Sequence, residues 1–92
     1  MQFSLVTSCF NNTKEINEFC YRVKDILNKE FDKYEIILVN DASTDDTMEK
    51  IKLICKKNKK IKAINLKRNI GQHYSIYCGL FLSKGKYVAV LD

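Results

Sequence analysis

The chain has 92 residues, a formal net charge of +5, 46% hydrophobic and 29% charged residues, which is room for one globular domain at most. With no proline and only three glycines, the composition excludes a disordered chain. No apolar run approaches the roughly 20 residues of a membrane span, and the first ten residues lack the basic leader of a signal peptide.

The cysteines give no sign of a metal site. The chain has four cysteines without a CxxC pair and a single histidine, so a zinc site is not expected. Most of the cysteines fall on or beside apolar helix faces, which predicts buried, reduced thiols in a reducing, cytoplasmic compartment.

A lysine run carries much of the positive charge: Lys56, Lys57, Lys59, Lys60 and Lys62. Lysines suit the negative end of a helix dipole, and no aromatic residues are interleaved among them as in single-strand binders. The run is therefore interpreted as a solvated helix end, and no nucleic-acid partner is expected.

Apolar periodicity predicts strands that alternate with helices. The expected strands cover residues 3–7, 34–39, 61–66 and 87–91, and the expected helices cover residues 16–27, 48–55 and 71–83. Asn12 and Glu15 have the spacing of a capping box before the first helix. Ser43 or Thr44 is expected to cap the second helix.

This order, β-α-β-α-β-α-β, predicts an α/β fold with a parallel sheet and helices on both faces. Ligands of such sheets bind outside the carboxyl ends of the strands. The polar junctions there are residues 8–12, 40–45 and 67–73, followed by Asp92. The chain has no GxGxxG turn and no P-loop. Ser8 and Cys9 stand where a phosphoacceptor receiver domain would need acidic residues.

The junction residues suit a nucleotide diphosphate. Asp41 can accept hydrogen bonds from a base or ribose, and Arg68 offers a planar fork for phosphate. Asp92 can hold a divalent cation against the diphosphate. Other roles stay open at this point: Asp41 ordering its own turn, Arg68 as a surface charge, and the acidic pair at 45 and 46 as a helix start.

At these junctions the chain resembles the family-2 glycosyltransferases of the GT-A fold. Residues 8–12 match in part the family's P-x-Y-N-E loop, residues 39–45 resemble V-D-D-G-S-T-D, and residues 88–92 resemble the approach to a D-x-D metal motif. Residues 68–73, followed by Gly79 and Leu80, are similar to the R-N-F-G-Q-H…G-L stretch of the polyprenyl-phosphate sugar transferases, the dolichol-phosphate mannose synthase-like branch.

The resemblance implies a Rossmann-like half of a GT-A fold, with residues 1–92 as the nucleotide-sugar-binding N-terminal part, cut at the first aspartate of D-x-D. It implies that Asp41 reads the base, Phe10 lines the base pocket, and Asp92 lies near ribose and metal. Asn11 and Ser43 complete the expected nucleotide-binding set with Arg68.

The activity that the resemblance implies is inverting, metal-dependent transfer of a hexose from a UDP- or GDP-sugar, with Mg²⁺ or Mn²⁺ as cofactor. The acceptor would be a polyprenyl phosphate or a glycan. The catalytic base would lie downstream, so no catalytic residue is assigned within the chain, and the segment alone is expected to be inactive. The full-length parent is expected in the cytoplasm or at the cytoplasmic face of the membrane. The bare fourth strand is expected to promote self-association.

The chain departs from the family pattern at four positions: Ser8 replaces proline, Asn12 an acidic residue, Asn40 the first aspartate, and Ala42 glycine. Alanine at position 42 suggests that this turn does not need a positive φ. The asparagines keep open an alternative: a non-catalytic α/β module that binds a nucleotide or a protein.

Overall fold

A computed structural model describes residues 1–91, and the expected alternation of strands and helices is confirmed. The elements follow the apolar runs of the sequence to within a few residues. In chain order they are β1 (Phe3–Cys9), α1 (Ile16–Glu30), β2 (Tyr34–Asn40), α2 (Thr47–Lys57), β3 (Ile61–Asn65), α3 (Gln72–Leu82) and β4 (Tyr87–Leu91).

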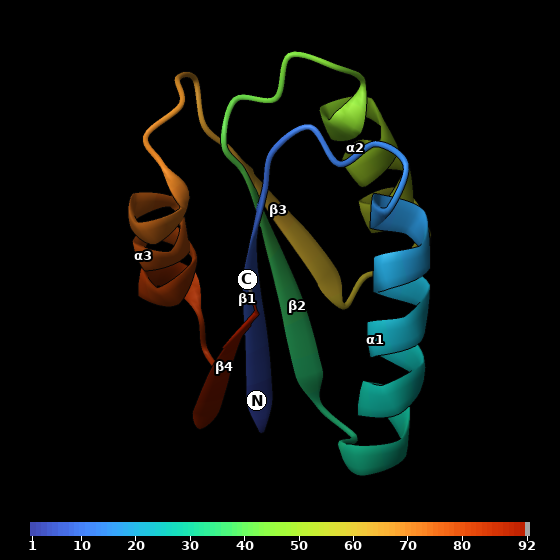
Figure 1. Ribbon diagram of the computed structural model, residues 1–92. Helices are drawn as coiled ribbons and strands as arrows, with labels where there is room; N and C mark the ends of the chain where they lie inside the picture. Colours follow the sequence, from blue (N-terminus) through green and yellow to red (C-terminus); the bar gives the residue numbers. More distant parts are fainter. Residues whose placement is uncertain (92) are drawn as a thin grey trace.

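The strands form one parallel sheet in the order β3-β2-β1-β4. β1 lies inside the sheet, where Val6 pairs with Ile37 of β2 and Val90 of β4. Figure 1 shows α1 and α2 on one face of this sheet and α3 on the other. The predicted α/β fold with helices on both faces is therefore confirmed.

The core has two parts, one on each face of the sheet. β2 is buried along its whole length and contributes side chains to both parts. Its Ile36 and Leu38 pack toward α1 and α2, and its Ile37 and Val39 pack toward α3. On the α3 side the helix approaches the sheet closely: a Cβ at Gly79 would lie 2.3 Å from Val6 Cγ1. Any larger residue at Gly79 would push α3 off the sheet.

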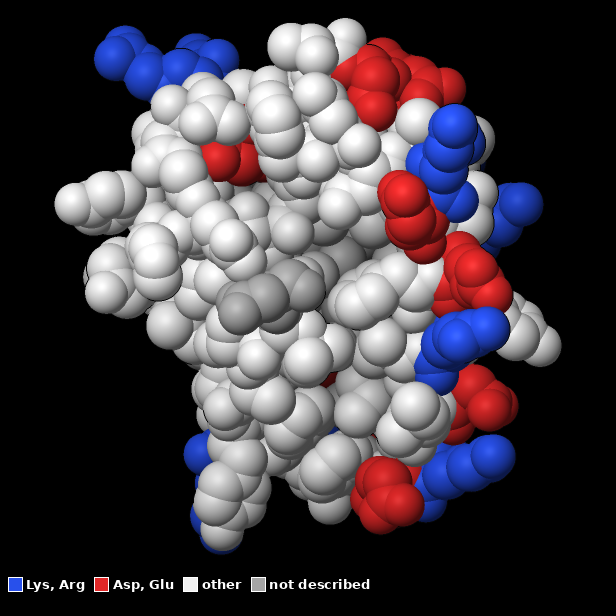
Figure 2. All heavy atoms as spheres, viewed as in Figure 1, with Lys and Arg blue, Asp and Glu red and all other residues white. Residues whose placement is uncertain are grey.

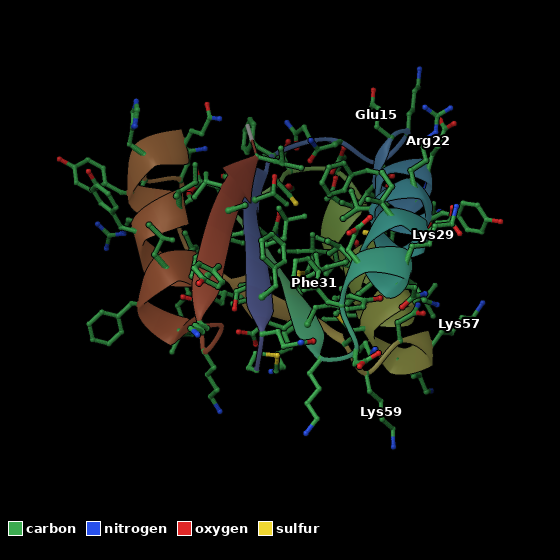
Figure 3. All side chains as sticks on the ribbon, turned by 90° about the horizontal axis from the view of Figure 1, so that it is seen from below. Glu15, Arg22, Lys29, Phe31, Lys57 and Lys59 are labelled. Carbon is green, nitrogen blue, oxygen red and sulfur yellow. The ribbon has the colours of Figure 1, made fainter. Side chains whose placement is uncertain are left out.

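The solvent side of α1 is charged. Arg22 pairs with Glu18 at 2.9 Å and Lys29 with Asp25 at 3.5 Å, both one helical turn apart. Figure 3 shows the labelled Arg22 and Lys29 pointing away from the sheet. Such exposed pairs contribute about 0.3–0.5 kcal/mol each, so α1 is held chiefly by its apolar face.

The carboxylate of Glu35 in β2 is buried, which the sequence did not predict. It is 1% exposed and accepts hydrogen bonds from Ser4 Oγ at 2.6 Å, Lys62 Nζ at 2.7 Å and the Lys84 N–H at 2.7 Å. Burial by itself raises the pKa of Glu35, but the bonds from Lys62, Ser4 and Lys84 outweigh it and leave the pKa lowered. This network joins the amino ends of the strands to the segment before β4.

The capping box expected at Asn12 and Glu15 is wrong. The α1 N-cap is Glu15 and has no side-chain cap. Instead, the N–H groups of Glu15 and Ile16 donate to the Asn12 carbonyl at 3.1 and 3.0 Å. A backbone turn thus starts the helix, and the Asn12 side chain is left for another role.

All four cysteines are free thiols, as expected, and Cys9 and Cys20 are buried. Burial, with a smaller effect of Cys20, raises the pKa of Cys9 to about 12. The Cys9 thiol, at the carboxyl end of β1, is therefore protonated at neutral pH and is no nucleophile. Among residues 1–91, no helix is long and apolar enough to cross a membrane.

Candidate functional site

Three loops gather at the carboxyl edge of the sheet, after β1, β2 and β3 (Figure 1). Between them lies an open hollow of about 370 Å³. Its lining comes from all three loops and the adjoining ends of β1 and α3: Ser8, Phe10, Asn12, Asp41, Asn69, Gly71 and Gln72. The structure thus brings Phe10 and Asp41 together at one edge.

Asp41 is buried, with 2% exposure, and both of its carboxylate oxygens are engaged. The Ile70 N–H donates to Oδ1 at 2.8 Å and the Gly71 N–H donates to Oδ2 at 2.9 Å. The Asn69 amide also donates to the Asp41 carbonyl oxygen at 3.2 Å. Asp41 therefore orders the loop between β3 and α3, about 30 residues further along the chain.

This contact also completes the start of α3. Gly71 is the N-cap with φ of 92°, and the first turn of α3 contains no acidic residue. A carboxylate near a helix N-terminus is favoured by the helix dipole and by the unpaired N–H groups there. Asp41 supplies that charge from the neighbouring loop, and Gly71 supplies the positive φ that other residues adopt at a cost.

Asn11 and Ser43, both expected to bind nucleotide, contact each other. The Asn11 N–H donates to Ser43 Oγ at 3.0 Å, and Asn11 Oδ1 accepts from the Thr44 N–H at 2.9 Å. These bonds join the loop after β1 to the loop after β2. The expected cap at Ser43 or Thr44 is wrong, because α2 begins at Thr47 with Asp46 as N-cap and without a side-chain cap.

The turn after β2 corrects a second expectation. Ala42 has φ of 57°, in the left-handed region, so this turn does need a positive φ. Alanine there costs roughly 1–2 kcal/mol relative to an unstrained backbone. The preceding Asn40 is buried, donates to Asn65 Oδ1 at 2.9 Å and accepts from Ser43 Oγ. Its amide holds the edge of the sheet together.

Asn12 stands out at the hollow. Its Oδ1 is buried without a hydrogen-bond partner, and no other buried side-chain polar atom of residues 1–91 lacks one. Buried acceptors are nearly always paired in folded proteins, so the unpaired Oδ1 marks Asn12 as the one residue of the hollow with a buried side-chain oxygen that has no partner among residues 1–91. The sequence analysis missed it because the Asn-x-x-Glu spacing suggested a helix cap.

The other predicted site residues lie further out. Phe10 borders the hollow with a 46% exposed ring. Arg68 is exposed on the loop between β3 and α3, and Asp92 lies outside the described residues. Asp45 and Asp46 belong to the start of α2: Asp45 Oδ1 accepts from the Thr47 N–H at 3.0 Å, and hydrogen bonds from Thr47 lower the Asp45 pKa.

A parallel α/β sheet with a polar hollow at its carboxyl edge is the architecture of a ligand-binding α/β protein. The sequence profile of glycosyl transferase family 2 matches residues 4–92. This chain belongs to that family.

Two curated relatives illustrate the family. An uncharacterized glycosyltransferase of Haemophilus influenzae is 36% identical over 89 residues, which cover 97% of this chain and 27% of that protein. The undecaprenyl-phosphate 4-deoxy-4-formamido-L-arabinose transferase of Pseudomonas savastanoi pv. phaseolicola is 31% identical over 90 residues, again 97% and 27%. The chain thus spans roughly a quarter of the length of these relatives.

Solved structures show the same fold. S. aureus TarS 1–349 in complex with UDP-GlcNAc superimposes with a TM-score of 0.81 at 26% identity, covering 100% of this chain and 26% of that one. The mannosyltransferase PcManGT from Pyrobaculum calidifontis, in complex with GDP-Man and Mn²⁺, gives 0.79 at 19% identity, covering 95% and 26%. The predicted Rossmann-like half of a GT-A fold is confirmed.

Proposed function

We propose that this chain binds the nucleotide diphosphate of a UDP- or GDP-sugar at the carboxyl edge of its sheet, as the donor-binding part of an inverting glycosyltransferase. The observation that carries the proposal is the hollow lined by Phe10, Asn12 and Asp41. It combines an exposed aromatic ring, a buried acceptor and an ordered loop in a space of nucleotide size. The family and the nucleotide-sugar complexes of its structural neighbours support the same function.

Each residue of the site would have its own role in binding the nucleotide. The Phe10 ring offers a stacking surface for the base, and Arg68 offers a guanidinium for phosphate. Asn12 Oδ1 is buried in this structure, and it would accept a hydrogen bond from a base N–H or a ribose hydroxyl after its amide turns toward the hollow. Both carboxylate oxygens of Asp41 already accept hydrogen bonds from the N–H groups at 70 and 71. The main role of Asp41 would therefore be to hold this loop in place at the site.

Asn12 and Asn40, which stand where the family has acidic residues, are compatible with these roles. Asn40 is matched by Asn65, which accepts its amide N–H, so the change from the family's aspartate is compensated within the sheet edge. This compensation favours a working donor site over the alternative of a module that has lost it. Asn12, by contrast, faces the hollow and is the residue that we expect to influence the choice of nucleotide.

A divalent cation would bind with the nucleotide. Asp92 and the diphosphate oxygens are the ligands that we propose for Mg²⁺ or Mn²⁺, an ion that commonly uses one or two carboxylates with substrate phosphates. When bound, the ion neutralises charge on the leaving diphosphate. Among residues 1–91, no cluster of three His, Cys, Asp or Glu side chains could hold such an ion.

The acceptor that we propose is a polyprenyl phosphate. The support is the name of a 31% identical relative, which transfers a sugar to undecaprenyl phosphate. A glycan acceptor is the second choice. The chain spans 27% of that relative, so the acceptor and the base that deprotonates it are proposals about the whole protein.

Calorimetric titration with UDP and GDP tests the donor site. We expect binding in the presence of Mn²⁺, weakened about tenfold or more by Phe10→Ala through loss of stacking, and weakened also by Arg68→Ala. Tyr21→Ala removes an aromatic ring that is 77% exposed on α1, and Lys59→Ala removes one charge at the opposite edge; both should bind normally. Equal affinity in all four variants would refute the site.

A further inference from the structure

Helix α3 is uncharged on all sides but buried on only one. It contains no Asp, Glu, Lys or Arg between residues 72 and 82. Ser75, Ile76 and Gly79 face the sheet and are buried. After its first turn, which holds the exposed Gln72 and His73, the outer side of α3 is apolar, and such a side is ordinarily covered by protein or lipid. The outer side of α3 therefore requires an explanation that the nucleotide site does not supply.

That outer side carries three aromatic residues, Tyr74, Tyr77 and Phe81, which we call the aromatic stripe of α3. Their spacing of three and four residues places them along one line of the helix. They are 64%, 62% and 90% exposed, and the two tyrosine rings meet edge to face at 6.1 Å. An almost fully exposed phenylalanine beside two largely exposed tyrosines forms the kind of patch that marks an interaction surface.

The exposed charges that flank α3 in the sequence are all positive, while the buried Asp41 carboxylate lies at the start of the helix. No Asp or Glu stands between Glu49 and Asp92, whereas eleven Lys and Arg residues do. Lys67 and Arg68 precede α3, and Lys84 and Lys86 follow it; all four are exposed. Figure 2 shows cations above and below a largely uncharged surface on the α3 side, with one acidic side chain visible near its upper end, while the other acidic side chains gather mostly over α1.

We propose that the aromatic stripe of α3 docks this chain on an anionic lipid surface. The tyrosine rings combine an apolar body with a hydroxyl that stays in the headgroup layer. The cations at both ends of the helix, roughly 16 Å apart, would meet lipid phosphates while the uncharged centre enters the interface. This inference goes beyond the proposed function, and Arg68 is the one residue that the two share.

Two other occupants fit the surface less well. A second copy would bring the same cations together, because a two-fold interface pairs a patch with itself. A nucleic-acid strand needs cations distributed among the aromatic rings, and α3 has none within its length. Lipid matches both the apolar centre and the basic ends.

The chain contains no tryptophan, so a single introduced indole reports on its own surroundings. We expect Tyr77→Trp to shift its emission to the blue with phosphatidylcholine–phosphatidylglycerol vesicles, and to be quenched by brominated lipid. Tyr21→Trp, at a site that is 77% exposed on α1, should do neither. Equal responses of the two variants, no response at Tyr77, or an equal response to pure phosphatidylcholine would overturn the proposal.

A second set of variants tests the cations. Lys84→Gln with Lys86→Gln should lower vesicle partitioning by about fivefold per charge removed. Lys52→Gln with Lys56→Gln removes the same net charge from α2 and should have a smaller effect. Equal losses would show attraction by net charge alone and overturn the docking face. Two other results would also overturn the docking face. One is displacement of the vesicles by a single-stranded oligonucleotide, and the other is a blue shift of the Tyr77→Trp emission when the chain self-associates without lipid.

Discussion

Replacing Asp41 with alanine tests the contact on which the candidate site is built. The change removes the acceptors of two N–H groups, at Ile70 and Gly71, which now bond at 2.8 and 2.9 Å. A hydrogen bond to a charged group contributes about 1.5–3 kcal/mol. Since Ile70 and Gly71 are half-buried, water can replace part of the loss, and we expect a net cost of about 3 kcal/mol in the free energy of unfolding.

Urea unfolding followed by far-ultraviolet circular dichroism measures this cost. Asp32→Ala, which removes an exposed carboxyl at the opposite edge, is the control and should stay within about 0.5 kcal/mol of the parent. The loss should also be local. Hydrogen exchange at the amides of Ile70 and Gly71 should accelerate well before exchange in β2, because the loop is released while the sheet persists.

The same variant examines the nucleotide site. If Asp41 holds the loop, Asp41→Ala should weaken UDP or GDP binding at temperatures where the sheet is still folded. Asp41→Asn keeps one acceptor but turns its NH₂ toward the other N–H, so it should resemble the alanine variant more than the parent. Unchanged stability in Asp41→Ala, or Ile70 and Gly71 amides that remain protected, would refute the reasoning.

Three further predictions concern other sites. Ala42→Gly should stabilise the fold by about 1 kcal/mol by relieving a positive φ, whereas Ala63→Gly in β3 should destabilise it by about as much; thermal unfolding compares them. Because the pKa of Glu35 is lowered from 4.5, its contribution is present above pH 4.5 and lost as the pH falls through the folded value. Glu35→Gln should therefore flatten the acid limb of a stability-against-pH curve. Manganese should bind tightly only with UDP or GDP present, and electron paramagnetic resonance would expose a nucleotide-independent site.

The strands and helices could be predicted because their signals are long and repeated. β2 reads as a continuous apolar run, and all seven of its residues are buried. The apolar residues of α1 recur at helical spacing, and the helix begins at Ile16, where that spacing starts. Once the alternation is known, the parallel orientation of the strands and their common carboxyl edge follow from the βαβ connections, and the right-handed crossovers place helices on both faces.

The two helix caps that were wrongly predicted share one cause: a short polar pattern does not say which backbone its side chain will reach. The Asn12 and Ser43 patterns suggested caps on the nearest helix. Ser43 bonds instead to Asn11 in the other loop, and Asn12 Oδ1 has no partner within residues 1–91. Glu35 was invisible for a related reason, since its partners lie 27 to 49 residues away.

The proposed nucleotide site and the proposed lipid-docking surface both involve α3, and single variants can test each of them without the other. Asp41 fixes the loop that begins this helix, at the end that borders the hollow, while the aromatic stripe occupies its outer side. A helix lying along a lipid surface would hold that hollow beside the headgroups, where a polyprenyl phosphate presents its phosphate. Vesicle binding by a variant that has lost UDP affinity, such as Phe10→Ala, would show that docking stands without the donor site. UDP binding by Phe81→Ser, with its vesicle affinity lost, would show the reverse.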